Sequence, residues 1–148
     1  MISRAEYNKK ISTNKNKLKN LRYICSDIKD IKSNNILIKK RINLLVSNSL
    51  IHHIHDLEDF FNTIRSLSSN ITVNFHKDLK RPTDEKSALE LKAQCSTRYN
   101  EILTNDYYAS LRASYTFKEL KSFTLENNLS SLDVFEDGDQ YLIVYGNV

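Results

Sequence analysis

The sequence predicts a mainly α-helical fold, a bundle built as one domain over residues 1–148. Three observations favour it. The 148 residues are 40% hydrophobic, enough for one core. Only two Gly and one Pro occur, a depletion that disfavours a loop-rich β-sandwich or barrel. From Ile36 to Leu67 apolar residues recur every three or four positions, which is the period of a helix face. We therefore expect a long central helix over about residues 36–67.

The N-terminal region predicts a second helix that folds back against the central one. Ser3 and Glu6 have the spacing of a capping box, so a helix can start at Arg4 and continue to about Ile31. Its apolar stripe is thin at the beginning, where Lys, Asn, Ser and Thr predominate. We expect residues 1–15 to form a flexible basic arm that either frays or becomes ordered only on a partner.

Positive charge is concentrated in this N-terminal part. Residues 1–43 hold twelve Lys and Arg against three Asp and Glu, whereas residues 44–148 hold ten against fifteen. Such a basic stretch either faces water, packs beside the acidic remainder of the chain, or binds an anionic partner such as nucleic acid. The candidate phosphate contacts are Lys15, Lys19, Arg22, Lys39, Lys40 and Arg41.

Shorter elements are expected after the central helix. Ile71–Phe75 alternates with period two, which indicates either a short strand or an extended connection. Thr83, directly after Pro82, is a good N-cap for a helix reaching about residue 105.

Two local signals mark the C-terminal third. Thr116 and Glu119 repeat the capping-box spacing and predict a helix over residues 117–126. An Asp-Gly pair between two β-rich runs predicts a small hairpin over about residues 132–145.

One cluster suggests metal chemistry. On a helix, His52 would share a face with His55 and Asp56, and His55 with Asp59. A zinc site needs three or four converging ligands, and His76 lies in another segment. The alternative is a polar helix face, which we favour, and we expect no resident metal. The same side chains could serve as acid and base in RNA hydrolysis, but no second feature supports this.

Enzyme signatures are otherwise missing from the sequence. Gly138 and Gly146 lie in the last eleven positions, so no Gly-rich loop opens a helix to hold phosphates. No GxSxG motif is present. We favour a non-enzymatic protein and expect no cofactor.

The C-terminal third also carries a candidate protein interface. Tyr combines contact area with a hydrogen-bonding tip, and acidic side chains near the predicted hairpin could imitate phosphate charge toward a basic partner. Tyr is equally an ordinary residue of a core shell. The candidate interface residues are Tyr107, Tyr108, Tyr115, Asp133, Glu136, Asp137 and Asp139.

A Leu-rich helix over Leu44–Phe61, in an all-helical domain of this length, resembles the HEPN ribonucleases and toxins. The marker of that family is an Arg followed four to six residues later by His. No Arg here, Arg41 and Arg65 included, has a His at that distance. The resemblance therefore implies at most a relative that lacks the usual motif.

Together these observations predict a small regulator or inhibitor, of a phage or another mobile element, that acts through protein–protein contacts. The alternatives are a nucleic-acid-binding protein that uses the basic helix, a HEPN-like relative, and self-association through the central helix. Residues Met1 to Lys10 lack the apolar core of a signal peptide, and the central segment is too often charged to span a membrane. We expect a cytoplasmic protein without membrane insertion.

Overall fold

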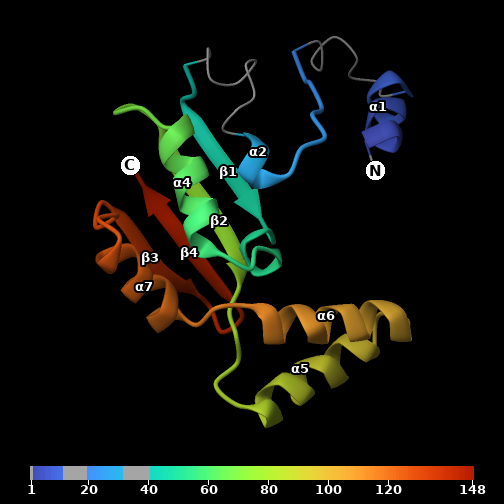
Figure 1. Ribbon diagram of the computed structural model, residues 1–148. Coiled ribbons are helices and arrows are strands. Elements are labelled where there is room, and N and C mark those ends of the chain that lie inside the picture. Colours follow the sequence, from blue (N-terminus) through green and yellow to red (C-terminus); the bar gives the residue numbers. More distant parts are fainter. Residues whose placement is uncertain (1, 12–19, 32–40) are drawn as a thin grey trace.

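The fold is a mixed four-stranded sheet with helices, seen in the computed structural model, which describes residues 2–11, 20–31 and 41–148 (Figure 1). The elements in chain order are α1 (Ile2–Ile11), α2 (Ile28–Ile31), β1 (Leu44–Asn48), the 3-10 turn η1 (Ile51–His53), α4 (Leu57–Leu67), β2 (Val73–Leu79), α5 (Glu85–Ser96), α6 (Glu101–Ala113), α7 (Phe117–Glu126), β3 (Leu132–Asp137) and β4 (Tyr141–Gly146).

The sheet has the strand order β1-β2-β4-β3. β1 and β2 are parallel, with Leu44 opposite Val73, and α4 forms the connection that a parallel pair requires. β4 runs antiparallel to both of its neighbours, β2 and β3. The chain is therefore an α/β protein with one parallel unit extended by an antiparallel hairpin.

This architecture shows that the prediction of a mainly α-helical bundle is wrong. Residues 36–40 of the expected central helix lie outside the described residues. The remainder of that segment divides into β1, η1 and α4. A five-residue apolar run fits a strand as well as a helix, so periodicity alone could not separate them. Ser49, with φ of 54°, has left-handed backbone geometry that interrupts any helix directly after β1.

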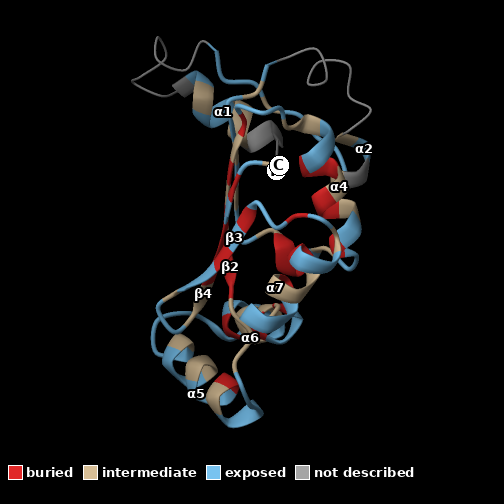
Figure 2. Cartoon of the chain, turned by 90° about the vertical axis from the view of Figure 1, so that its left-hand side faces the viewer, coloured by how far each residue is buried: buried red, intermediate tan, exposed pale blue. Residues whose placement is uncertain are grey.

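The core lies between one face of the sheet and the helices α4 and α7. Leu57, Phe60, Phe61 and Ile64 of α4 are buried there, at the three- and four-residue spacing that the sequence shows. The ring of Phe61 stacks on that of Phe123 in α7 with centroids 5.2 Å apart. Figure 2 shows the sheet edge-on, with α4 and α7 on the same side.

The opposite face of the sheet is the more exposed one. Leu44 and Val46 of β1, Phe135 of β3 and Tyr145 of β4 alternate with the inward-facing residues and are all exposed. Such alternation follows from the two-residue period of a strand.

The N-terminal prediction is also corrected in part. Residues 2–11 form α1, but residues 21–27 have no regular secondary structure, and α2 is a single turn that packs against α4. No continuous helix from Arg4 to Ile31 exists, and the turn expected between it and the central helix lies outside the described residues.

Two of the C-terminal predictions are confirmed as local structure. The capping box of Thr116 and Glu119 is present at the start of α7. The predicted hairpin forms as β3 and β4, with Gly138 at φ of 64° in its loop, although it belongs to the four-stranded sheet. The helix expected after Thr83 is instead the pair α5 and α6, because Asp84 caps the first and Asn100 caps the second.

In the part of the chain that the structure describes, no helix is both long and apolar enough to cross a membrane.

Candidate functional site

The candidate site lies at the edge of the sheet where β1 and β2 both end. Because the two strands are parallel, their carboxyl ends meet at this edge, which is where open α/β sheets bind their ligands. The turn that follows β1, residues 49–56, lies at this edge. The helices α5 and α6 extend beyond the same edge (Figure 1).

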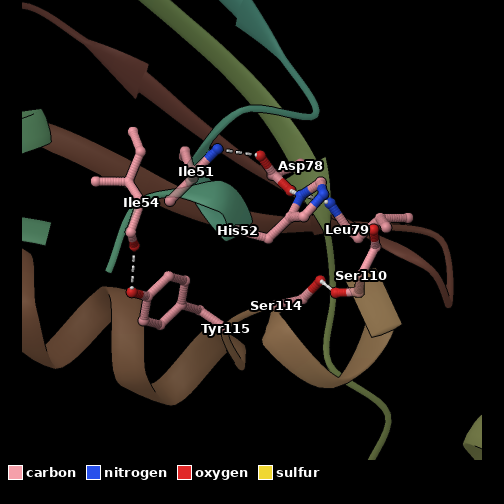
Figure 3. A network of polar contacts seen from close by, with 8 residues as sticks. All are labelled: Ile51, His52, Ile54, Asp78, Leu79, Ser110, Ser114 and Tyr115. Carbon is pink, nitrogen blue, oxygen red and sulfur yellow. Dashed lines mark hydrogen bonds and ion pairs between the residues drawn. The ribbon is translucent and has the colours of Figure 1, made fainter. Parts of the chain in front are cut away.

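Asp78, near the carboxyl end of β2, holds this turn in place (Figure 3). Its carboxylate accepts a hydrogen bond from the backbone N–H of Ile51 at 2.5 Å and another from that of Leu79 at 2.7 Å. Its third partner is Nδ1 of His52. Both side chains of this His52–Asp78 pair are only 3% exposed. One buried carboxylate thus connects η1 to β2.

The turn is also held from the side of the helices. The hydroxyl of Tyr115 donates to the carbonyl of Ile54 at 3.1 Å, and α6 contacts η1. At the other end, the N–H of Ser49 donates to the carbonyl of Lys77 at 2.9 Å, which keeps the chain next to β2 as it leaves β1. Residues 49–54 are therefore fixed at both ends.

One imidazole on this fixed turn faces solvent. His53 is exposed, and its ring centroid lies 4.0 Å from that of buried His52. Imidazole groups exchange protons near neutral pH, and a ring whose neighbours are fixed is positioned for such exchange. Asn48, the last residue of β1, is exposed at the same edge.

Beneath the turn, the inward face of β2 is polar. Asn74, His76 and Asp78 alternate along the strand, and all three are buried. Nδ1 of His76 pairs with the hydroxyl of Ser47 at 2.9 Å, and the ring of Phe60 packs edge-on at 5.1 Å. Burial lowers the pKa of His76 to about 4. This imidazole is neutral at physiological pH.

The residues proposed from the sequence as metal ligands do not share a helix face. His52 is buried on Asp78, and His55 is exposed between η1 and α4. Asp56 is the N-cap of α4 and accepts from the N–H of Glu58, while Asp59 lies in the first turn of that helix. Among the described residues, no three His, Cys, Asp or Glu side chains gather as metal ligands do.

Of the candidate phosphate contacts, Arg22 and Arg41 lie among the residues that the structure describes. Arg22 and Arg41 are exposed on separate segments. The four lysines, Lys15, Lys19, Lys39 and Lys40, lie outside the described residues.

The candidate interface residues fall into two groups. Tyr107 and Tyr108 lie on α6, and Tyr115, which follows it, is occupied by the carbonyl of Ile54. Of the acidic set, Asp133, Glu136 and Asp139 are exposed. Asp137 pairs with Lys77 at 2.5 Å and Glu136 with Lys80 at 3.2 Å, so two of these four acidic groups are neutralised by cations of β2 and the residue after it.

Sequence reasoning missed Asp78 and the role of Tyr115. A single polar residue such as Asp78 does not by itself distinguish a strand from a loop in the sequence. Its partner His52 also lies 26 positions away in the chain. The alternation of Asn74, His76 and Asp78 was the available signal, since it continues the period-two pattern that starts at Ile71.

No protein-family profile matches the sequence, and neither does any curated protein. Among solved structures, the chain is similar to the plantazolicin methyltransferase BpumL, which was solved in complex with a triazolic desmethylPZN analog and SAH. The TM-score is 0.61 over 97% of this chain and 72% of that one, at 15% identity. The fold resembles that of a methyltransferase.

This likeness corrects the functional prediction as well as the fold. A regulator or inhibitor built as a helical bundle, a basic recognition helix and a HEPN-like relative all presuppose a mainly α-helical domain. The mixed four-stranded sheet, which resembles that of a methyltransferase, contradicts that premise.

Proposed function

We propose that the chain catalyses the transfer of a methyl group and binds the methyl acceptor where β1 and β2 end. The observation that carries this proposal is the buried Asp78 carboxylate, which fixes the turn after β1 at the edge where α/β sheets bind ligands. We take the reaction class by analogy from the similar methyltransferase, since a fold alone does not specify a reaction.

The SAH bound by that methyltransferase raises the question of an S-adenosyl donor here. Close approach of a backbone to a ligand is easiest at glycine, which has no Cβ. Residues 49–56 contain no glycine, and Gly138 and Gly146 both belong to the β3–β4 hairpin. The turn after β1 therefore lacks the residue that most easily allows such an approach, and we assign none of the described residues to the donor.

The residues of this chain act on the acceptor. If a nitrogen or oxygen of the acceptor takes the methyl group of a sulfonium donor, the donor's carbon–sulfur bond would break and leave a neutral thioether. Exposed His53 is placed to accept the proton that the acceptor then loses. Buried His52 and Asp78 position the turn that carries His53, and they do not touch the acceptor. Tyr115 supports the same turn through Ile54.

The proposal is tested in the native cells, fed methionine with a deuterated methyl group. Small molecules and proteins that gain the heavy methyl group are compared by mass spectrometry between cells with the gene, cells without it, and cells that carry His53→Gln. We expect at least one labelled product that disappears with the gene and falls about tenfold or more in His53→Gln, as for the loss of a proton-accepting group.

His55→Gln is the matched control, because His55 is an equally exposed imidazole two residues further on, outside η1. It should leave the labelled product unchanged. With the chain itself detected in each culture, an identical set of labelled products in all four cultures would contradict the proposal.

A further inference from the structure

An open depression of about 710 Å³ lies between the α5–α6 pair and the start of β4. Tyr141 lines it and pairs with Leu79, the last residue of β2, so the depression opens at the same edge of the sheet. Tyr107 lines it as well. This residue belongs to α6, the helix that contacts η1.

Flat aromatic and apolar groups form much of its wall. Tyr99 is 57% exposed and Leu103 is 51% exposed, so both side chains are accessible to a ligand in the depression. Tyr107 and Tyr141 are half-buried. The hydroxyl of Tyr107 donates to Oε1 of Gln140 at 3.4 Å, and burial raises its pKa, with nearby Tyr141 and Cys95 adding to the effect.

The same depression holds a cation with unused hydrogen-bonding capacity. The guanidinium of Arg98 makes no hydrogen bond or ion pair with any residue that the structure describes. A guanidinium matches a carboxylate with two parallel hydrogen bonds. Arg98 therefore supplies a positive charge at the rim of an aromatic hollow.

A second depression, of about 520 Å³, offers a comparison. It is lined by Lys80, Arg81 and Glu136, among others, and there Lys80 pairs with Glu136 while Arg81 pairs with Glu119. Two of its three cations are thus paired and Lys118 is not paired with any described residue, but the carboxylates of Glu90, Glu136 and Asp139 line it as well, whereas no carboxylate of the described residues lines the aromatic depression. The aromatic depression is thus the better site for an anionic ligand.

We propose that this depression binds a planar aromatic compound that carries a carboxylate. The rings of Tyr99 and Tyr107 would pack on the flat part of the ligand, and Arg98 would bind its carboxylate. Assigning this compound as the methyl acceptor rests on the proposed function, whereas the binding itself does not.

The probe is 2-naphthoate, a bicyclic aromatic carboxylate, with neutral 2-naphthamide as its uncharged counterpart. Binding to the full chain is measured by calorimetry and by amide shifts in NMR spectra. We expect Arg98→Gln to weaken 2-naphthoate about tenfold and leave 2-naphthamide nearly unchanged, because only the charged pairing is lost. Tyr99→Ala should weaken both compounds about fivefold, because the packing is lost.

Ile102→Ala is the matched control, since Ile102 is 72% exposed on the same helical pair but does not line the depression. It should leave both affinities unchanged. The inference is overturned by an absence of saturable 2-naphthoate binding, by shifts confined to other surfaces, or by equal effects of Arg98→Gln on both compounds.

The outcomes separate this inference from the proposed function. Binding that follows the expected pattern, without any gene-dependent labelled product, contradicts methyl transfer and leaves the binding site in place. A gene-dependent product without 2-naphthoate binding contradicts only the ligand class.

Discussion

Asp78 shows how a single buried carboxylate can shape a site. Its oxygens satisfy two backbone N–H groups and one imidazole, and each would be costly to bury alone. The turn after β1 has no hydrogen-bond ladder of its own beyond η1, so its position depends on this side chain and on Tyr115.

We expect Asp78→Ala to lower the free energy of unfolding by about 2–4 kcal/mol, because it leaves buried donors without partners. Urea denaturation measures the change. Asp133→Ala is the control, since Asp133 is exposed on β3 and should shift stability by no more than about 0.5 kcal/mol. Equal effects of the two variants would show that the carboxylate of Asp78 does not hold the turn.

His76 predicts a dependence of stability on pH. Its pKa falls from 6.5 when unfolded to about 4 when folded, so between these values the unfolded chain binds a proton that the folded chain does not. The contribution of neutral His76 to the free energy of unfolding is therefore fully present above about pH 6.5. It is lost as the pH falls toward 4, and the loss amounts to about 3 kcal/mol.

Denaturation curves from pH 7 to pH 4 check this prediction. His76→Gln should show a smaller loss over this range, whereas His55→Gln, at an exposed imidazole, should keep the full loss. A His76→Gln variant with the same pH dependence as the parent chain would assign the loss to other groups.

At the scale of elements, Asp56 illustrates how a local signal was misread. The sequence offers it as a weak candidate metal ligand and, in the favoured interpretation, as part of a polar helix face, whereas in the structure it is the N-cap of α4. Asp56→Ala should cost about 1 kcal/mol of stability, and Asp56→Asn, which keeps a capping oxygen, should cost much less. Thermal unfolding distinguishes the variants, with His55→Ala as the neutral neighbour. Equal losses in Asp56→Ala and Asp56→Asn would argue against capping.

The elements that were predictable depend on neighbours in the sequence. The start of α7 follows from Thr116 and Glu119, three positions apart, and the β3–β4 hairpin follows from the Asp-Gly pair in its loop. β1 was missed because its five residues are too short for a period and its partner β2 is reached only through α4. The break between α5 and α6 was missed because Asn100 was not recognised as a cap.

At the scale of the whole molecule, the site combines segments that the sequence keeps apart. His52 and His55 were found as a cluster, yet the partner that matters, Asp78, comes from the next strand. Sequence reasoning can find the titratable residues but cannot pair them until the parallel strands are recognised. The same holds for the aromatic depression, whose walls come from α5, α6 and β4.

In the proposed function, the methyl acceptor binds at the carboxyl edge of the sheet and not at its amino edge. β1 offers a matched test, because the exposed residues Asn43 and Asn48 lie at its opposite ends. The measurement is the yield of the gene-dependent methyl-labelled product in cells that carry Asn48→Ala or Asn43→Ala. We predict that Asn48→Ala lowers the yield severalfold and Asn43→Ala leaves it unchanged. Equal yields, or a loss confined to Asn43→Ala, would contradict the account.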